Sequence, residues 1–216
     1  AQRVAARDPF FAGNVDALIA AQPKDLEASE IEVRLGATWF DKKYIEQFMY
    51  ETFETPRYLR GQIEISYVPY TAEWQVSRKS MVRYNDVAAF TTYGTDRASA
   101  YRLLEDALNL RDIRIYDTIE DADGRERRVL NAKETTLAAQ KQQLIRDAFK
   151  DWIWKDPERR ETLVRQYNEE MNSTRPREYD GSHIVFSGMN PEITLREHQK
   201  NAIAHVLYGG NTLLAH

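Results

Sequence analysis

The sequence lacks cysteine altogether and contains only four histidines. Without cysteine the chain can form neither disulfide bonds nor zinc sites with thiolate ligands. Two of the histidines, His198 and His205, are seven residues apart on one expected helix, too far apart to ligate one ion, so we predict no metal site. A G-x-S-x-G nucleophile elbow is also absent, and we predict no catalytic residue in this chain.

Long apolar runs and an excess of one charge are missing too. No stretch approaches the roughly 18 apolar residues that span a bilayer, and the first residues do not resemble a secretory signal. We therefore expect a cytoplasmic protein without a membrane partner. Lys and Arg number 30 against 34 Asp and Glu, so the net charge is −4, which argues against a uniformly basic nucleic-acid binder. Any contact with DNA phosphates must come from local patches.

Hydrophobic periodicity predicts an α+β fold, with a small and mostly antiparallel sheet and helices packed against it. Apolar residues at helical spacing predict helices over 14–22 and after the caps Asp41, Thr95 or Asp96, Asn131, Asp156 and Thr194, with Pro157 as the first helical residue after Asp156. Alternating residues predict strands at 31–33, 63–67, 73–76 and 80–84, and a hairpin that joins 113–116 to 127–130. Thr194 and Glu197 have the spacing of a capping box for the last helix.

Composition divides the chain into four expected parts. These are a lead-in helical segment (1–30), an α+β accessory domain (31–172), an extended connector (173–192) and a terminal part with a helix and an apolar run (193–216). The connector is rich in Ser, Pro, Arg, Asp and Gly, which favour extended or turning backbone.

Two basic patches are candidates for contact with nucleic acid. In the first, Arg78, Lys79 and Arg83 alternate with the aromatic residues Trp74 and Tyr84, a mixture that suits phosphate contact with base stacking. The second lies on the expected hairpin and consists of Arg125, Arg127 and Arg128. Acidic neighbours dilute the second patch, so a solvated hairpin with local ion pairs stays open as an alternative.

Gln199 is the candidate for recognition of a nucleotide base. A side-chain amide offers both an acceptor and donors, so it can match the exocyclic amine and ring nitrogen of adenine. The other interpretation is an ordinary polar residue on an amphipathic helix. The phosphate-binding loop G-x-x-x-x-G-K-[ST], which would complete a nucleotide site, does not occur in the sequence.

Several segments together resemble the large helicase–methylase proteins of phages and conjugative elements. In those proteins a DNA adenine methylase region precedes a Swi/Snf-like superfamily 2 helicase. The segments that carry the resemblance are Tyr179–His183, Ile193–Lys200, with its Leu-Arg-x-His-Gln pattern, Tyr208–His216, Ile31–Trp39 and Tyr116–Thr118. The terminal part would then be the first helix and strand of a helicase lobe, and we expect the chain to be one piece of such a protein.

The resemblance implies specific roles for two residues. Gln199 would read adenine, with Arg196 as a weaker neighbour, and the parent protein would use ATP and magnesium. The chain itself would hold no cofactor and would act as a non-catalytic accessory or linker domain between the methylase and helicase, with contact to DNA. A purely structural or protein–protein adaptor without nucleic-acid binding is the alternative, and the acidic pI of about 5.7 and the patches of mixed charge favour it for the isolated chain.

Overall fold

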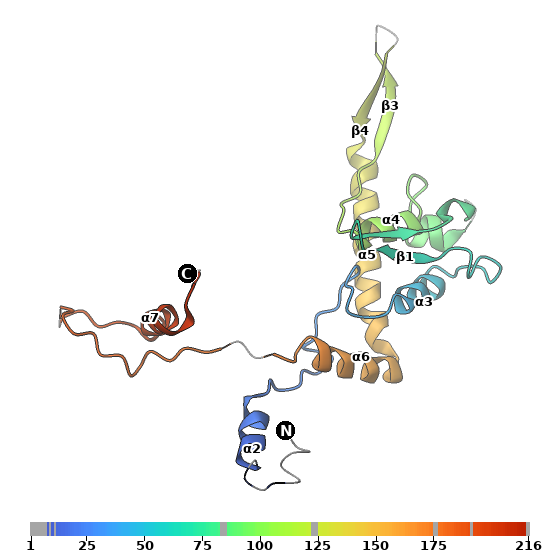
Figure 1. Ribbon diagram of the computed structural model, residues 1–216. Helices are drawn as coiled ribbons and strands as arrows, with labels where there is room; N and C mark the ends of the chain where they lie inside the picture. The colour runs from blue at the N-terminus through green and yellow to red at the C-terminus, as the bar shows by residue number, and fades with distance from the viewer. Residues whose placement is uncertain are drawn as a thin grey trace. The chain divides into compact units, whose positions relative to one another are not determined.

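The computed structural model describes residues 8, 10, 12–82, 86–121, 125–174, 177–190 and 192–214. The chain divides into two units, Lys24–Ser173 and a second one built from Ala1–Pro23 and Thr174–His216. Figure 1 traces both units. Within the described residues no helix is both long and apolar enough to cross a membrane.

The unit Lys24–Ser173 contains most of the regular structure. Its helices are α3 (Lys43–Thr52), α4 (Ala100–Leu108), α5 (Ala132–Lys155) and α6 (Pro157–Glu170), with a short 3-10 helix η2 (Lys79–Met81) and a π-helix η3 (Ala88–Thr92). Its strands are β1 (Ile65–Val68), β2 (Glu73–Val76), β3 (Tyr116–Glu120) and β4 (Glu126–Leu130). The second unit contains α2 (Ala12–Ala21) and α7 (Glu197–Gly209).

The α+β prediction is confirmed, although the strands of the described residues form two separate antiparallel pairs rather than one sheet. The first pair joins β1 to β2, and the second joins β3 to β4. The described residues of the strand predicted at 80–84 do not form a strand, because η2 occupies Lys79–Met81; residues 83–85 lie outside the described residues. Arg78 precedes η2 with a φ of 47°, in the left-handed region, which turns the chain away from the direction of β2.

Residues 31–35 have the alternation of a strand without its hydrogen-bonded ladder. Ile31, Val33 and Leu35 are buried, whereas Glu32 and Arg34 between them are exposed. No described strand pairs with this segment, so the strand predicted at 31–33 is wrong. The alternation reflects burial of every second side chain against the core, and it directs Glu32 and Arg34 to the surface.

The core of this unit lies around α5, which contacts α3, α4 and α6. Ile145, Phe149 and Ile153 of α5 are completely buried. From α3, Phe48 meets the Phe149 ring edge to face, with centroids 5.1 Å apart. Burying each such side chain contributes about 1.5–3 kcal/mol relative to leaving it in water. The helical spacing of these residues therefore fixes which face of α5 turns inward.

The turn between α5 and α6 is held by capping interactions. Asp156 accepts a hydrogen bond from the backbone N–H of Arg159 at 2.8 Å, and Pro157 occupies the first helical position, as the sequence predicts. Arg159 in turn caps the end of α5, because its Nε donates to the carbonyl of Ile153 at 2.9 Å. Its guanidinium also lies 3.6 Å from the Trp152 ring centroid. These contacts set the direction in which α6 leaves α5.

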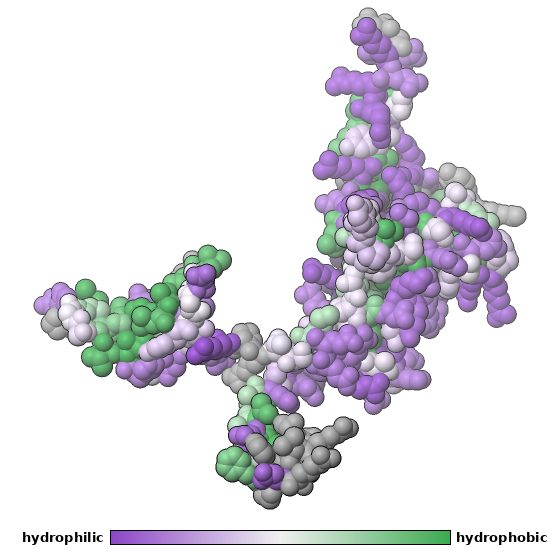
Figure 2. Space-filling view, in the orientation of Figure 1, coloured by the Kyte–Doolittle hydropathy of each residue, from purple (hydrophilic) through white to green (hydrophobic). Residues whose placement is uncertain are grey.

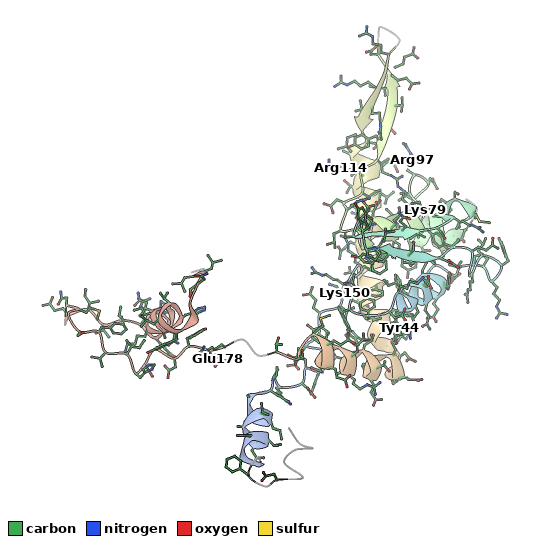
Figure 3. All side chains as sticks on the ribbon, viewed as in Figure 1. Tyr44, Lys79, Arg97, Arg114, Lys150 and Glu178 are labelled. Carbon is green, nitrogen blue, oxygen red and sulfur yellow. The ribbon has the colours of Figure 1, made fainter. Side chains whose placement is uncertain are left out.

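The β3–β4 hairpin projects past the N-terminal end of α5 (Figure 1). Every residue of β4 is exposed, so the hairpin is attached only at its base. There Asp117 accepts hydrogen bonds from Arg97 Nη1 and from Asn131 Nδ2, both at 2.7 Å. Arg97, labelled in Figure 3, also donates to the carbonyl of Tyr116 at 2.9 Å. The hairpin predicted from the sequence is present, with β3 starting at Tyr116 rather than at 113.

In the second unit, residues 177–183 lie along α7. Gly181 donates its N–H to Asn201 Oδ1 at 2.8 Å, and a Cβ at Gly181 would lie 2.0 Å from the carbonyl oxygen of Lys200. The ring of Tyr179 stacks on His205 with centroids 4.3 Å apart. The described part of the predicted connector has no helix or strand, and residues 211–214 do not form the strand expected after the last helix.

Candidate functional site

The described members of the first basic patch, Trp74, Arg78 and Lys79, do not form a continuous binding surface. Trp74 is only 5% exposed, its ring packs 4.9 Å from the Tyr67 ring, and its Nε1 donates to the carbonyl of Gly36 at 3.3 Å. A tryptophan in this position cannot stack on a base, so its proposed role at a DNA interface needs correction. The reason is that successive side chains of β2 point to opposite faces, with Trp74 and Val76 turned inward and Gln75 outward.

The cations of the first patch differ in how they are paired. Lys79 forms an ion pair with Glu105, a residue that also accepts the N–H of Val76 at 2.8 Å. Arg78 is exposed and has no ion pair with any described residue. The two remaining members, Arg83 and Tyr84, lie outside the described residues.

The second patch is on the exposed β4 strand and the turn before it. Arg127 lies opposite Ile119 and Arg128 lies opposite Thr118, so the two arginines face opposite sides of the ribbon. The Arg128 guanidinium is 4.9 Å from the ring centroid of Tyr116, and Arg125 is exposed next to the tip. None of these three arginines makes an ion pair with a described residue. Glu120 and Glu126 lie opposite each other and reduce the positive charge of the Arg128 side.

Gln199 and Arg196 lie at the start of α7. Arg196 is the N-cap, and its backbone N–H donates to Gln199 Oε1 at 2.9 Å. This bond takes the place of the predicted Thr194–Glu197 capping box, because the helix begins at Glu197 rather than at a residue next to Thr194. Both side chains are exposed, and the Nε2 of Gln199 makes no hydrogen bond within the described residues. Arg196 cannot complete a reciprocal box, since a guanidinium has no acceptor.

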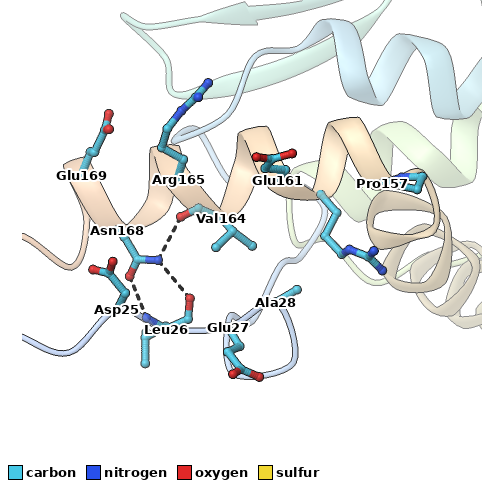
Figure 4. Close-up of a pocket in the computed structure, with 11 residues that line it drawn as sticks. Asp25, Leu26, Glu27, Ala28, Pro157, Glu161, Val164, Arg165, Asn168 and Glu169 are labelled. Atoms are coloured by element: carbon cyan, nitrogen blue, oxygen red, sulfur yellow. Dashed lines mark hydrogen bonds between the residues drawn. The ribbon is translucent and has the colours of Figure 1, made fainter.

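A hollow of about 830 Å³ lies between α6 and the extended residues 25–28 (Figure 4). Its lining carries carboxylates from Asp25, Glu27, Glu161 and Glu169 and guanidinium groups from Arg160 and Arg165. Asn168 closes one side, where its side-chain amide pairs with both backbone polar groups of Leu26. The mixed charges do not favour one class of ligand.

A further pair of adjoining hollows was not predicted from the sequence. One, of about 230 Å³, is lined by Arg34, Arg146 and Lys150, and the next, of about 560 Å³, is lined by Trp39 and Tyr167. They share the residues Glu32, Arg34, Leu35 and Leu110, and so form one depression. We call it the basic–aromatic groove and define it by Arg34, Arg146, Lys150, Trp39 and Tyr167. The same-sign pair Arg146 and Lys150, one helical turn apart, was the signal in the sequence that could have indicated it.

The pKa values of Tyr101 and Asp117 are shifted, and both side chains make hydrogen bonds within the fold. Burial raises the pKa of Tyr101 to about 12, and the Thr55 hydroxyl lies 2.7 Å from its phenol oxygen. Hydrogen bonds from Arg97 and then Asn131 lower the pKa of the partly exposed Asp117. No group of three or more His, Cys, Asp or Glu residues in the described part of the chain could hold a metal ion.

Comparison with known proteins identifies a family. Residues 34–173, more than half of the chain, match the family described as Domain of unknown function (DUF8437), and the chain therefore belongs to this family. No curated protein and no solved structure matches the chain. The family match covers residues 34–173 of the unit Lys24–Ser173, including the hairpin and the five residues that define the basic–aromatic groove, and it does not extend to α7.

Proposed function

We propose that this member of the family is a non-catalytic part of an ATP-driven DNA helicase or translocase that is linked to a DNA methylase. The unit Lys24–Ser173 would serve as an accessory domain between the two enzymes, in the cytoplasm. Residues 193–214 would carry the element that reads adenine ahead of a phosphate-binding loop. The observation that carries the proposal is the position of Gln199, exposed in the first turn of α7, with its amide nitrogen unused by the described residues.

The chemistry of Gln199 suits adenine better than guanine. Its Nε2 can donate to the adenine ring nitrogen, and its Oε1, which has two lone pairs, can accept from the exocyclic amine while it still caps α7. Guanine presents an acceptor where adenine presents its amine, so the amide would be mismatched. ATP and magnesium would act in the parent, since this sequence has no loop of the Walker type to hold phosphates. Arg196 is exposed one turn away and is the second candidate for nucleotide contact.

The hairpin is the element that we propose contacts DNA. A two-stranded ribbon fits the major groove of a duplex, and Arg125, Arg127 and Arg128 are available on such a ribbon. The first patch contributes less, because Trp74 is buried and Lys79 is paired with Glu105. Those two facts also support the second candidate function, a structural or protein–protein adaptor without a role in nucleic-acid binding.

A single substitution separates adenine reading from helix capping. Gln199→Glu keeps the oxygen that caps α7 but removes the Nε2 donor, whereas Gln199→Ala removes both. In the full-length protein that carries this chain, ATP and GTP turnover would be measured for both variants. We expect Gln199→Glu to lose about 1–3 kcal/mol of the preference for ATP, the discrimination typical of a bidentate contact. The chain alone should hydrolyse no ATP, because the groups that stabilise phosphoryl transfer are absent from it.

Two results would overturn these assignments, one for Gln199 and one for the chain as a whole. If Gln199→Glu leaves the ratio of ATP to GTP turnover unchanged, while circular dichroism shows α7 intact, Gln199 only caps the helix. DNA-stimulated ATP turnover by the chain alone would contradict its non-catalytic role.

A further inference from the structure

The basic–aromatic groove, like the hairpin, holds cations that form no ion pair with a described residue, whereas several other cations of this unit are paired. Lys79, Arg97 and Arg111 each form an ion pair, with Glu105, Asp117 and Glu73 respectively. In contrast, the side chains of Arg34 and Lys150 have no ion pair and no hydrogen bond with any described residue. Arg146 makes one long contact, from Nη1 to Gln143 Oε1 at 3.5 Å.

Among the described residues, no carboxylate forms an ion pair with the three cations of the groove. Glu32 lines both hollows, yet it forms no ion pair with the three cations. Asp147 on α5 accepts a hydrogen bond from Gln143 Nε2 at 2.9 Å. Arg146 and Lys150 lie one helical turn apart, where like charges repel, so a bound anion between them would relieve that repulsion. Figure 3 labels Lys150 on α5.

The other end of the groove offers an aromatic surface that is already positioned. Trp39 is partly exposed, and its ring meets the Tyr167 ring edge to face, with centroids 5.1 Å apart. Its carbonyl accepts a hydrogen bond from Gln166 Nε2 at 2.7 Å, which fixes the backbone beneath the ring. A ring held in this way loses little freedom when a planar ligand packs on it.

We propose that the basic–aromatic groove binds single-stranded DNA, with phosphates at Arg34, Arg146 and Lys150 and a base packed against Trp39. Unpaired cations beside an aromatic ring are the features by which proteins hold single strands without reading their sequence. A duplex fits less well, since its bases are paired and their faces are covered. The proposal goes beyond the helicase assignment, because these side chains would recognise a single strand in any parent protein.

The test uses the purified chain and a fluorescent oligothymidine of about 12 nucleotides, with anisotropy measured at several salt concentrations. The groove variant is Arg34→Glu, Arg146→Glu and Lys150→Glu. The control variant, Arg57→Glu, Arg160→Glu and Lys133→Glu, changes two arginines and one lysine at exposed sites away from the groove and has the same net charge. We expect the groove variant to bind at least tenfold more weakly and the control to bind like the original chain.

Two further arms identify what is recognised. An abasic strand of equal length keeps the phosphates but removes the bases, and we expect it to bind more weakly than oligothymidine. In a plot of the logarithm of the binding constant against the logarithm of the salt concentration, the groove variant should give a shallower slope. The slope should decrease by about 0.7 for each phosphate that the variant no longer neutralises.

Equal losses of affinity in the groove and control variants would show a general charge effect and overturn the proposal. So would competition by poly-glutamate as strong as that by oligothymidine, because an acidic peptide has no base. A failure here would leave the Gln199 experiment unaffected.

Discussion

The side-chain amide of Asn168 pairs with both backbone polar groups of Leu26, 142 residues away in the sequence. The N–H of Leu26 donates to Asn168 Oδ1 at 2.8 Å, and Asn168 Nδ2 donates to the Leu26 carbonyl at 2.9 Å. Figure 4 shows both bonds. This pairing substitutes for a neighbouring strand and holds the start of the unit against α6.

Asn168→Ala should therefore loosen the first residues of the unit. Removing two partly buried hydrogen bonds, with their backbone partners left behind, should cost about 1–3 kcal/mol of unfolding free energy. Urea denaturation would measure the loss, and limited proteolysis should show faster cleavage near residues 24–30. Glu169→Ala, one position further on an exposed face, is the control and should change little. Equal stability of the two variants would show that the Leu26 pairing is not required.

Tyr101 should make stability depend on alkaline pH. Burial raises the pKa of its phenol to about 12, against 10.0 for an ordinary tyrosine. Between these values the unfolded chain releases the proton and the folded chain keeps it. The stabilisation is thus complete below pH 10 and is lost as the pH rises towards 12, by up to about 2–3 kcal/mol.

Tyr101→Phe provides the comparison for that prediction. It should cost about 0.5–1.5 kcal/mol at neutral pH, because Thr55 loses its partner at Tyr101 but can still donate to the Met49 carbonyl. Urea midpoints recorded from neutral to alkaline pH would show a shallower decline in this variant. Parallel curves for the two proteins would mean that other groups cause the alkaline loss.

Gly181→Ala should separate residues 177–183 from α7. The added Cβ would lie 2.0 Å from the carbonyl oxygen of Lys200, a backbone atom that cannot move without shifting the helix. We expect a cost of about 1–3 kcal/mol, the usual range for overpacking. Hydrogen exchange would measure it as faster exchange of the amide at position 181, which Asn201 protects. Gly13→Ala, where a Cβ meets nothing within 4 Å, is the control and should exchange normally.

The hairpin arginines should weaken duplex binding when their charge is reversed. Arg127→Glu should lower the affinity of the chain for duplex DNA. It should also reduce the slope of the logarithm of the binding constant against the logarithm of the salt concentration by about 0.9, the value for one phosphate that is no longer neutralised. Arg57→Glu has the same charge change at an exposed position outside the hairpin and should leave both quantities unchanged. Gel shifts at low salt would provide the comparison. Indistinguishable affinities, or no binding by the unchanged chain, would favour the adaptor function.

The sequence predicted the helices best where caps and periodicity agree. Asn131 and Asp156 were expected to begin α5 and α6, and both accept the hydrogen bond of an N-cap. The α+β class also follows from periodicity. The alternation in Glu73-Trp74-Gln75-Val76 places Trp74 and Val76 on one face of β2, but it does not say whether that face is covered. Only the packing of Tyr67 and the carbonyl of Gly36 decide that Trp74 turns inward.

The candidate sites were harder to predict because they depend on which charges find partners. Lys79 and Arg78 are neighbours in the sequence, yet only Lys79 reaches a carboxylate, through an α4 residue 26 positions away. The basic–aromatic groove combines Arg34, Trp39, Arg146 and Tyr167, which no local pattern connects. It exists because residues 31–39 pass beside α5 and α6, a long-range contact that alternation alone does not reveal.

The length of α5 has a mechanical consequence for the unit. Its 24 residues, with about 1.5 Å of rise each, hold the base of the hairpin about 36 Å from the turn at Asp156. Since both ends are capped, the helix works as a spacer of fixed span. Adding or removing one residue would also rotate the hairpin by about 100° about the helix axis. Selection on this protein should therefore act on the number of residues in α5 as strongly as on their identity.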